Sequence, residues 1–353
     1  MENIKGIYNN CEVIEILKKL VSYNTIKDKE NNEILNFISS QLQDLGFKVE
    51  KKEKYLIMSI GKYYELGFIG HSDTVDYIEG WSTNPFKLIE KDGKLYGLGA
   101  CDMKSGIAAF MQALKEVDLS KLKKGIKVYI TYDEEISFKG IKEVLQVEPQ
   151  IPDYIIVGEP TDNKILTGCK GLLAIKLNTT GIKVHSSRTD KGKNANSSMI
   201  KLLYELEEYY EKEIKTYQDK RYEVPYTTMN VGIIKGGNSI NSVSDKCESY
   251  IDFRVIKEDH IQKIKDKVKE LSEKYQATYK IDIEINPFFN NIDFIKEQNT
   301  ASFMTEASFV KGKRIILGAG EVSAHEVDEH ISIKSLQELV NQYKGLIYKI
   351  CYN

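Results

Sequence analysis

The sequence predicts an α/β protein, with a mostly parallel sheet covered by helices on both faces and a smaller α+β domain inserted into it. In the first half of the chain, short β-rich runs alternate with amphipathic helical segments, a pattern typical of parallel sheets. The chain has 353 residues, enough for roughly two domains of about 150 residues each. In the middle of the chain the pattern changes, and two helical segments lie among several amphipathic strands.

The larger domain is predicted to be discontinuous, formed by residues 1–171 and 289–353. In its first part we expect helices at 10–21, 30–45, 103–117 and 138–146 and strands at 47–52, 55–60, 65–70, 125–132 and 153–158. In its second part we expect a strand within 314–320 and a final helix at 332–350.

The inserted domain is predicted to span residues 172–288. Strands are expected at 172–181, 228–237, 247–255 and 279–285, with helices at 195–213 and 258–275. His260 falls on a charged face of the second helix, and we expect it to be exposed to solvent.

Charge and cysteine content exclude several classes of protein. The 50 basic and 52 acidic side chains give a net charge of −2, so no general attraction to nucleic acid or to an anionic membrane is expected. No apolar run approaches the roughly 20 residues of a membrane helix. The five cysteines lie far apart and contain no CxxC, which favours a reducing cytoplasm over a disulfide framework or a thiolate metal site.

Acidic and imidazole side chains follow the predicted strands at the points where the strands end. His71 follows the strand at 65–70, the acidic run 133–135 follows 125–132, and Glu159 follows 153–158. Asp102 precedes a predicted helix after a turn-rich stretch. Because ligands of open α/β sheets bind beyond the carboxyl ends of the strands, these side chains are expected to meet. Oxygen and imidazole donors without thiolates suit Zn, Co or Mn.

Each of these pieces has a simpler explanation when it is taken alone. A His-x-Asp pair is more often a hydrogen-bonded surface pair, an acidic run is usually a solvated loop, and Gly-Glu-Pro is usually only a turn. No partner thiol or base lies near Cys101 in the sequence, so Cys101 is expected to be a packing residue beside the site. The metal hypothesis depends on the recurrence of the pieces at one structural position.

A set of motifs resembles one family over residues 66 to the C-terminus. These are GHSDTV (70–75), LYGLGACDMKSG (95–106), DEE (133–135), GEPT (158–161), HSS (185–187), GGNSIN (236–241), DFR (252–254) and AHEVDE (324–329). They are similar to the dinuclear zinc family of aminoacylases and carboxypeptidases that includes acetylornithine deacetylases and succinyl-diaminopimelate desuccinylases. EGWSTNPFKL, VPYTTMNVG and TEASFV resemble the acetylornithine deacetylase branch.

The resemblance implies a site with two divalent metal ions, zinc first, with cobalt or manganese as alternatives. Asp102 would bridge the two ions. His71 and Glu159 would complete one site, and Glu135 and His325 the other. The resemblance also makes Glu134 the general base that takes a proton from the attacking water. Asp73 would accept a hydrogen bond from the far nitrogen of His71 and so fix its tautomer.

The inserted domain is implied to serve as a lid and to form a homodimer. In the family a histidine of this domain reaches the site of the neighbouring subunit as an oxyanion donor, and His185 matches it. Val184 precedes it where the family usually has glycine. Arg254 matches a clamp for the substrate carboxylate, with Asn241 beside it; the alternative is a salt bridge from Arg254 to Asp252 or Glu248.

The activity implied is hydrolysis of the amide bond of an N-acyl-L-amino acid, with N-acetyl-L-ornithine as the expected substrate. Succinyl-diaminopimelate, acetyl-lysine and dipeptides are the alternative substrates, and a catalytically inactive binding protein on the same fold is the alternative of another class. Glu306 is a candidate partner for the ammonium group of ornithine, because a buried ammonium needs a carboxylate. The alternative for Glu306 is a residue that begins or caps a helix.

Overall fold

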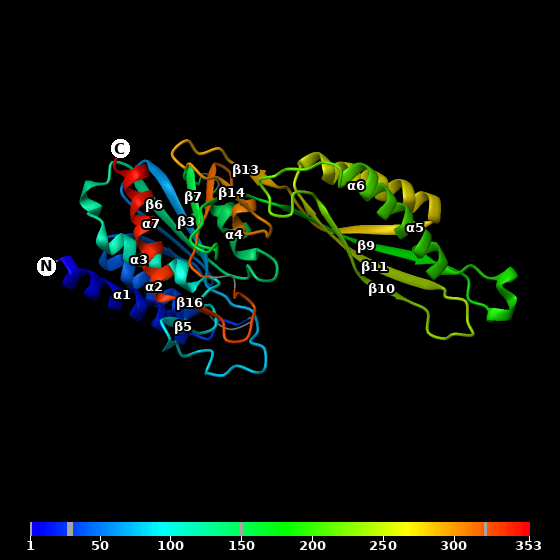
Figure 1. Cartoon of the computed structure of the whole chain (residues 1–353), viewed down its shortest axis with the longest axis horizontal. Helices are drawn as coiled ribbons and strands as arrows, with labels where there is room; N and C mark the ends of the chain where they lie inside the picture. The colour runs from blue at the N-terminus through cyan, green and yellow to red at the C-terminus, as the bar shows by residue number, and fades with distance from the viewer. Residues whose placement is uncertain (1, 27–30, 149–150, 321–322) are drawn as a thin grey trace. The chain divides into compact units, whose positions relative to one another are not determined.

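The chain folds into two compact units, which Figure 1 shows from the N-terminus in blue to the C-terminus in red. The computed structural model describes residues 2–26, 31–148, 151–320 and 323–353. The first unit comprises residues 1–167, 290–299 and 305–353, and the second comprises 168–289 and 300–304. Sequence analysis placed the same divisions at 171/172 and 288/289, and it did not anticipate that 300–304 belong to the second unit.

The first unit contains the helices and strands of a layered α/β domain. Its helices are α1 (Glu2–Ser22), α2 (Asn32–Asp44), α3 (Lys104–Glu116), η1 (Leu119–Lys121), α4 (Lys139–Val147), η4 (Glu306–Ser308) and α7 (Ile333–Cys351). Its strands are β1 (Lys48–Lys51), β2 (Leu56–Ile60), β3 (Tyr64–His71), β4 (Ile89–Lys91), β5 (Lys94–Tyr96), β6 (Gly125–Thr131), β7 (Tyr154–Val157), β15 (Lys313–Ile316) and β16 (His330–Ser332). Among the described residues, no helix combines the length and the apolar character needed to cross a membrane.

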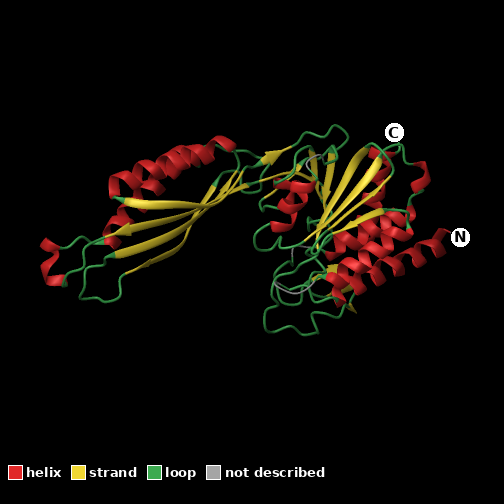
Figure 2. Ribbon diagram, turned by 180° about the vertical axis from the view of Figure 1, so that it is seen from behind, coloured by secondary structure: helices red, strands yellow, loops and turns green. Residues whose placement is uncertain are grey.

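The large sheet has a parallel centre and antiparallel edges, and it appears as the broad yellow fan of Figure 2. Its order is β1-β2-β6-β3-β7-β15-β8, where β8 spans Leu166–Cys169. Strands β6, β3, β7 and β15 run parallel to one another, whereas β2 and β8 pair antiparallel with their neighbours. The four parallel strands therefore end at the same edge of the sheet.

Apolar side chains of α1, α2, α3 and α7 pack on one face of this sheet and form the main core. At its centre the ring of Phe68 stacks on that of Phe110 with centroids 4.2 Å apart, and Tyr343 packs edge-on to Phe68 at 5.8 Å. Phe68 lies on β3, Phe110 on α3 and Tyr343 on α7, so the three rings join the sheet to both helices. The opposite face is covered in part by α4 through the buried Ile141 and Val144.

A small three-stranded sheet, in the order β16-β5-β4, was not predicted from the sequence. Strands β4 and β5 form a hairpin at Asp92 and Gly93, and β16 pairs with β5 although it lies more than 230 residues later (His330 opposite Tyr96, 330 − 96 = 234). Strands of three residues carry too little periodicity to be recognised, and a distant partner leaves no local pattern.

The second unit is a four-stranded antiparallel sheet with two helices on one face. Its strands are β9 (Gly171–Thr180), β10 (Thr228–Gly236), β11 (Lys246–Val255) and β12 (Ala277–Ile285), in the order β10-β11-β9-β12. Its helices are α5 (Ala195–Tyr209), α6 (Glu258–Tyr275) and the short η2 (Ser186–Lys191) and η3 (Tyr210–Ile214). Leucine and isoleucine side chains of α5 and α6 pack on β9 and β11 to form a core separate from that of the first unit. Strands β13 (Phe288–Phe289) and β14 (Asn299–Ala301) pair with β8.

The expectation that His260 is exposed was wrong. Its side chain is only 1% exposed, and its Nδ1 lies 2.8 Å from the hydroxyl of Thr227. The ring also packs edge-on against Tyr217. His260 lies in the first turn of α6, where the tertiary contacts with Thr227 and Tyr217 outweigh the charged character of the neighbouring sequence.

We predict opposite stability effects for two glycine-to-alanine substitutions in helices of the first unit. In α3, a Cβ on Gly106 would lie 2.3 Å from the carbonyl oxygen of Gly158, next to Glu159, so Gly106→Ala should lower the free energy of unfolding by about 1–3 kcal/mol. In α7, a Cβ on Gly345 would meet nothing within 4 Å, so Gly345→Ala should raise it by roughly 0.5–1 kcal/mol.

Urea unfolding of the two variants beside the wild type measures both changes. The Gly345 variant is the control for the general gain that alanine brings to a helix. A gain of stability in both variants would show that α3 does not depend on its close approach to Gly158.

Candidate metal centre

The parallel strands deliver the predicted side chains to one edge of the sheet. Strand β3 ends at His71, and β7 ends at Val157, two residues before Glu159. Strand β6 ends at Thr131, and the acidic run 133–135 follows it. Because these strands are parallel neighbours, their carboxyl ends meet and bring the side chains together.

Asp102 lies at the centre of the cluster, and each of its two oxygens faces a different imidazole. Its Oδ1 is 3.1 Å from Nε2 of His71, and its Oδ2 is 3.6 Å from Nε2 of His325. Glu135 approaches Nε2 of His325 to 3.0 Å, and Glu159 approaches Nε2 of His71 to 3.8 Å. A carboxylate in this position can bridge two cations, one through each oxygen.

The donor atoms of the described residues form three groups; two of them match the two predicted sites, and the third joins Glu134 to His71 and Glu135. His71, Asp102 and Glu159 offer atoms within 4.8 Å of one another, and so do Asp102, Glu135 and His325. Glu159 is 4% exposed, and its Oε1 has no hydrogen-bond partner among the described residues. A buried carboxylate oxygen without a partner is costly unless a cation meets it, so these residues fit divalent metals with nitrogen and oxygen ligands.

Glu134 lies beside the cluster, buried to 8% exposure, with its carboxylate close to the donor atoms of His71 and Glu135. Burial raises the pKa of Glu134 well above its usual value, and the charges of Asp102, Glu135 and Glu306 add to this, while His71 opposes it. The pKa of Glu159 is also raised well above normal, first by burial and then by Asp102 and Glu134. Side chains that share negative charge in this way need cations to stay ionised.

The two histidines feel the same negative charge. Burial acts against protonation of His71, but the hydrogen bond to Asp102 and the nearby carboxylates of Asp73 and Glu159 outweigh it and raise the pKa of His71 well above its usual value. The hydrogen bond to Glu135 raises the pKa of His325 to about 9. A bound metal would replace the proton on each Nε2.

Asp73 lies next to His71, but its carboxylate does not make the predicted hydrogen bond. Nδ1 of His71 is 3.0 Å from the backbone carbonyl of Asp73 and 3.6 Å from its Oδ1. The carbonyl acceptor fixes the tautomer with Nδ1 protonated, which leaves Nε2 for a metal. Oδ2 of Asp73 accepts instead from the backbone N–H of Glu135 at 3.4 Å.

Cys101 lies beside Asp102 and has the packing role that was expected. The side chain is fully buried, and burial raises the pKa of its thiol to about 12. A thiol with this pKa stays protonated at neutral pH and is a poor metal ligand.

Glu306 is completely buried beneath the same edge of the sheet. Its Oε2 accepts a hydrogen bond of 2.9 Å from the hydroxyl of Thr131, and its Oε1 has no hydrogen-bond partner in the described part of the chain. Burial raises the pKa of Glu306 to about 7, and the neighbouring His71 opposes the rise. Glu306 is also the first residue of the short helix η4, which agrees with the alternative prediction that it begins a helix.

A cavity of about 760 Å³ opens beside the cluster and shares Asp73 and Glu135 with it. The described residues that line the cavity include five acidic and two basic side chains. The acidic ones are Asp73, Glu135, Glu53, Asp76 and Asp133, and the basic ones are Lys54 and Lys139. Thr25 and Thr74 also line it, and each has a buried hydroxyl to which no described residue makes a hydrogen bond. The cavity is therefore acidic and holds free acceptor oxygens.

His185 and Asn241 lie together in the second unit. The backbone N–H of Ser186 donates to the carbonyl of Asn241 at 2.9 Å, and His185 forms a bridge with Ser242. Nδ1 of His185 accepts from the backbone N–H of Ser187 at 3.2 Å, so its proton sits on Nε2 and is available to a ligand. Val184 is not among the residues with positive φ, so this turn does not need the glycine that the family usually has.

The expectation that Asn241 lies beside Arg254 was wrong. Arg254 is opposite Leu172 at one end of β11, whereas Asn241 precedes the other end, where Lys246 is opposite Thr180. Eight residues of strand separate the two ends (254 − 246 = 8), which is about 26 Å at 3.3 Å per residue. Nε of Arg254 donates to Oδ1 of Asp252 at 2.9 Å, the salt bridge that was the alternative.

Sequence reasoning gave no role to Glu329, the last residue of AHEVDE. Its carboxylate is 2% exposed and accepts hydrogen bonds from the backbone of the turn that carries Asp102. The only signal in the sequence was its place in a motif with His325, because its partners lie more than 220 residues earlier (329 − 102 = 227).

Comparison with known proteins gives a consistent result. Residues 67–349 match the model of peptidase family M20/M25/M40. The chain is 31% identical to an acetylornithine deacetylase of Buchnera aphidicola subsp. Acyrthosiphon pisum, over 96% of this chain and 98% of that protein. It is 30% identical to an acetylornithine deacetylase of Vibrio campbellii, with the same shares of both chains covered.

Solved structures show the same fold. A metallo-carboxypeptidase of the M20 family from Sulfolobus solfataricus has a TM-score of 0.76 at 18% identity, over 94% of this chain and 98% of its own. A tripeptidase from Staphylococcus aureus has a TM-score of 0.77 at 20% identity, over 96% and 97%. Together with the two groups of metal donors, these matches identify the chain as a member of peptidase family M20/M25/M40, a metal-dependent enzyme that hydrolyses amide bonds.

Proposed function

We propose that the protein hydrolyses the amide bond of an N-acyl-L-amino acid, and that its substrate is N-acetyl-L-ornithine, which gives L-ornithine and acetate. The observation that carries the proposal is Asp102, whose two oxygens face two separate donor groups while Glu134 stays beside both. This arrangement provides for two metal ions and keeps one carboxylate for proton transfer.

Two divalent ions, zinc in the first place and cobalt or manganese as alternatives, would be held by His71, Asp102 and Glu159 and by Asp102, Glu135 and His325. When bound, they supply Lewis-acid polarisation of the acyl carbonyl and acidify the attacking water. The nitrogen and oxygen donors, with the thiol of Cys101 kept protonated, support these metals over thiolate-loving ones.

Glu134 is the residue of this chain that moves the proton. Its carboxylate takes a proton from the attacking water and then returns it to the leaving amine as the amide bond breaks. The burial of Glu134 favours a carboxylate able to hold a proton between these two events. The hydrogen bond between Nδ1 of His71 and the backbone carbonyl of Asp73 keeps the imidazole of His71 in a fixed orientation during the transfer.

An ornithine side chain is supported by the charge of the cavity and by the names of the relatives. The cavity next to Glu135 is lined by five acidic and two basic side chains, which suits an ammonium group better than a second carboxylate. An anionic succinyl group would meet repulsion there, so acetyl-lysine is the alternative substrate that fits this charge, and neutral dipeptides come after it.

The second unit is proposed to form the homodimer and to supply His185 to the neighbouring subunit as oxyanion donor. His185 exposes a protonated Nε2, which supports the donor role. Since Asn241 is held beside His185 and far along β11 from Arg254, we expect Asn241 to act together with His185. Arg254 would bind the substrate carboxylate separately, and Asp252 would hold its guanidinium in place.

A turnover panel tests the substrate proposal. N-acetyl-L-ornithine, N-acetyl-L-lysine, N-acetyl-L-methionine, N-succinyl-diaminopimelate and a dipeptide are compared by kcat/KM with zinc or cobalt added. The highest value is expected for N-acetyl-L-ornithine. A higher value for the dipeptide or the succinyl compound would overturn the choice of substrate but leave the metal centre intact.

Glu134→Gln should keep both metals and lower kcat by roughly 10²–10⁴-fold, because the side chain moves the proton and holds no metal. Glu135→Gln is the matched comparison, since the adjacent side chain should lose metal together with activity. Elemental analysis beside steady-state rates separates the two variants. A Glu134 variant with most of its activity would disprove the base assignment.

Glu306→Gln should lower kcat/KM for N-acetyl-L-ornithine about 10–150-fold more than for neutral N-acetyl-L-methionine, through loss of a charge-assisted hydrogen bond. The unpaired Oε1 of Glu306 supports contact with the substrate ammonium group. The complete burial of Glu306 favours the contrary role, in which it supports the residues at the edge of the sheet that carry the metal ligands. Equal losses on both substrates would assign Glu306 to the support of His71 and Thr131.

Mixing His185→Ala chains with Glu134→Gln chains should restore about a quarter of the wild-type activity, because half of the dimers are hybrids with one complete site. Asn241→Ala should complement Glu134→Gln in the same way, and it should fail to complement His185→Ala. If subunits demonstrably exchange and no hybrid regains activity, His185 acts within its own chain or has no role in turnover.

A further inference from the structure

Glu329 binds the turn that carries the bridging residue Asp102. Its Oε1 accepts from the backbone N–H of Cys101 at 2.7 Å and of Asp102 at 3.0 Å, and its Oε2 accepts from Gly99 at 2.9 Å. A buried carboxylate that accepts three backbone N–H groups makes charge-assisted bonds, which are stronger than neutral ones. The turn from Gly99 to Asp102 is therefore held from outside, by a residue on another loop.

That other loop is the one that carries His325. Ser323 and His330 close this loop through two hydrogen bonds. The hydroxyl of Ser323 donates to the backbone carbonyl of His330 at 2.8 Å and accepts from the backbone N–H of His330 at 3.1 Å. The backbone carbonyl of Glu329 also accepts a hydrogen bond from the N–H of Gly97 at 3.0 Å. Glu329 directly precedes β16, which pairs with β5. Glu329 thus ties the loop of His325 to the loop of Asp102 through both its side chain and its backbone.

The loop of His325 depends on such contacts for its shape. It lies between β15 and β16, and two of its described non-glycine residues have positive φ, His325 at 64° and Asp328 at 59°. Non-glycine residues adopt this conformation at a cost that the surrounding structure must offset. Oδ1 of Asp328 adds one contact, by accepting from the N–H of Ser82 at 2.8 Å, but it does not reach the turn of Asp102.

The two donor groups depend on this tie to different degrees. In the first group, His71 and Glu159 stand at the ends of β3 and β7, which the sheet holds independently of the loop. In the second group, Glu135 follows β6, but His325 stands on the loop itself and reaches Asp102 across 3.6 Å. A change at Glu329 therefore frees one ligand of the first group, Asp102, but two ligands of the second group, Asp102 and His325, so the second site should weaken more.

We propose that Glu329 is a positioning residue that fixes the separation of Asp102 and His325 and thereby sets the affinity of the second metal site. The inference rests on the proposed two-metal function. Glu329 is not itself a ligand, since both of its oxygens are engaged by backbone N–H groups and it belongs to neither donor group. Glutamine cannot replace it, because its amide nitrogen would face the N–H of Gly99 or that of Cys101 and Asp102.

Calorimetric titration of zinc into the metal-free full-length protein tests the proposal. The wild type should bind two equivalents. Glu329→Gln should keep the first affinity within about threefold and lose roughly 10–100-fold at the second, as happens when residues that orient metal ligands are removed. His325→Ala, which removes the second-site ligand directly, should show the same asymmetry.

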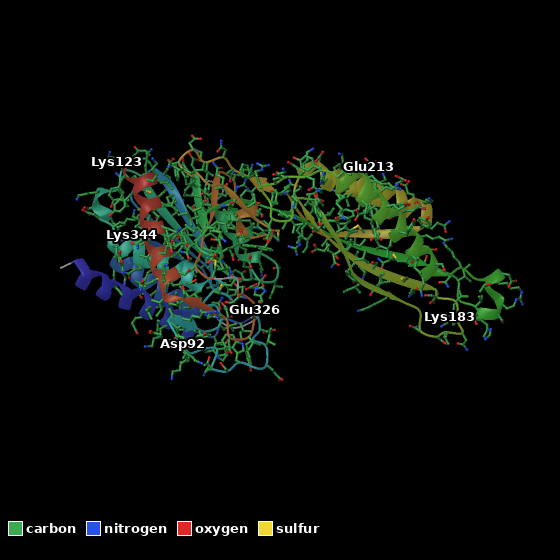
Figure 3. The ribbon with its side chains drawn as sticks, viewed as in Figure 1. Asp92, Lys123, Lys183, Glu213, Glu326 and Lys344 are labelled. Atoms are coloured by element: carbon green, nitrogen blue, oxygen red, sulfur yellow. The ribbon has the colours of Figure 1, made fainter. Side chains whose placement is uncertain are left out.

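Glu326→Gln is the matched control, because it is the same glutamate-to-glutamine substitution on the same loop. Its side chain is exposed, and it is labelled on the edge of the first unit in Figure 3. Both zinc affinities of this variant should equal those of the wild type. A weaker second equivalent in Glu326→Gln would mean that loop charge, and not the tie to Asp102, sets the affinity.

Two results would overturn the proposal. The first is a Glu329→Gln variant that binds both equivalents like the wild type. The second is equal weakening of both equivalents with a lower melting temperature of the metal-free protein, which is the pattern of a general stabilising role. If Glu329→Gln is too unstable to titrate, Glu329→Asp, which keeps the charge, is titrated and the same asymmetry decides. A wild type that binds fewer than two zinc ions would instead refute the two-metal function on which the inference rests.

Discussion

Asp102 places one carboxylate between two imidazoles, and the arrangement of the whole ligand edge depends on this contact. One oxygen faces His71 and the other faces His325, so the position of Asp102 determines where both proposed metals can bind. Burial first, and then the charges of neighbouring carboxylates, raise the pKa values of Glu134 and Glu159 well above normal. Such a concentration of buried carboxylates is stable as ions only with cations among them.

The fold positions the predicted metal ligands by two independent means. Parallel strands β3, β6 and β7 bring His71, Glu135 and Glu159 to one edge through backbone pairing, so these positions follow from the sheet itself. Asp102 and His325 lie on irregular turns, which have no ladder of their own. Glu329 joins those two turns, and this explains why a carboxylate without contact to any metal donor is buried next to the site.

The second unit separates its polar residues along one strand. Arg254 stands at one end of β11, and His185 and Asn241 cluster at the other, about 26 Å away at 3.3 Å per residue. One copy of this unit therefore cannot present all three to the same small ligand. This separation gives a physical reason to expect that an amino-acid substrate uses residues of two subunits.

The sequence by itself determined the features that are local. Period-two and period-3.6 patterns predicted most helices and strands, and polar residues directly after strands predicted His71, Glu135 and Glu159 at one edge. The tertiary structure alone decided what depends on distant pairing. It paired β16 with β5, buried His260 against Thr227, separated Asn241 from Arg254 and placed Glu329 under the turn of Asp102. Side-chain periodicity records which face of an element is buried, whereas the identity of the partner across hundreds of residues is set only when the elements pack.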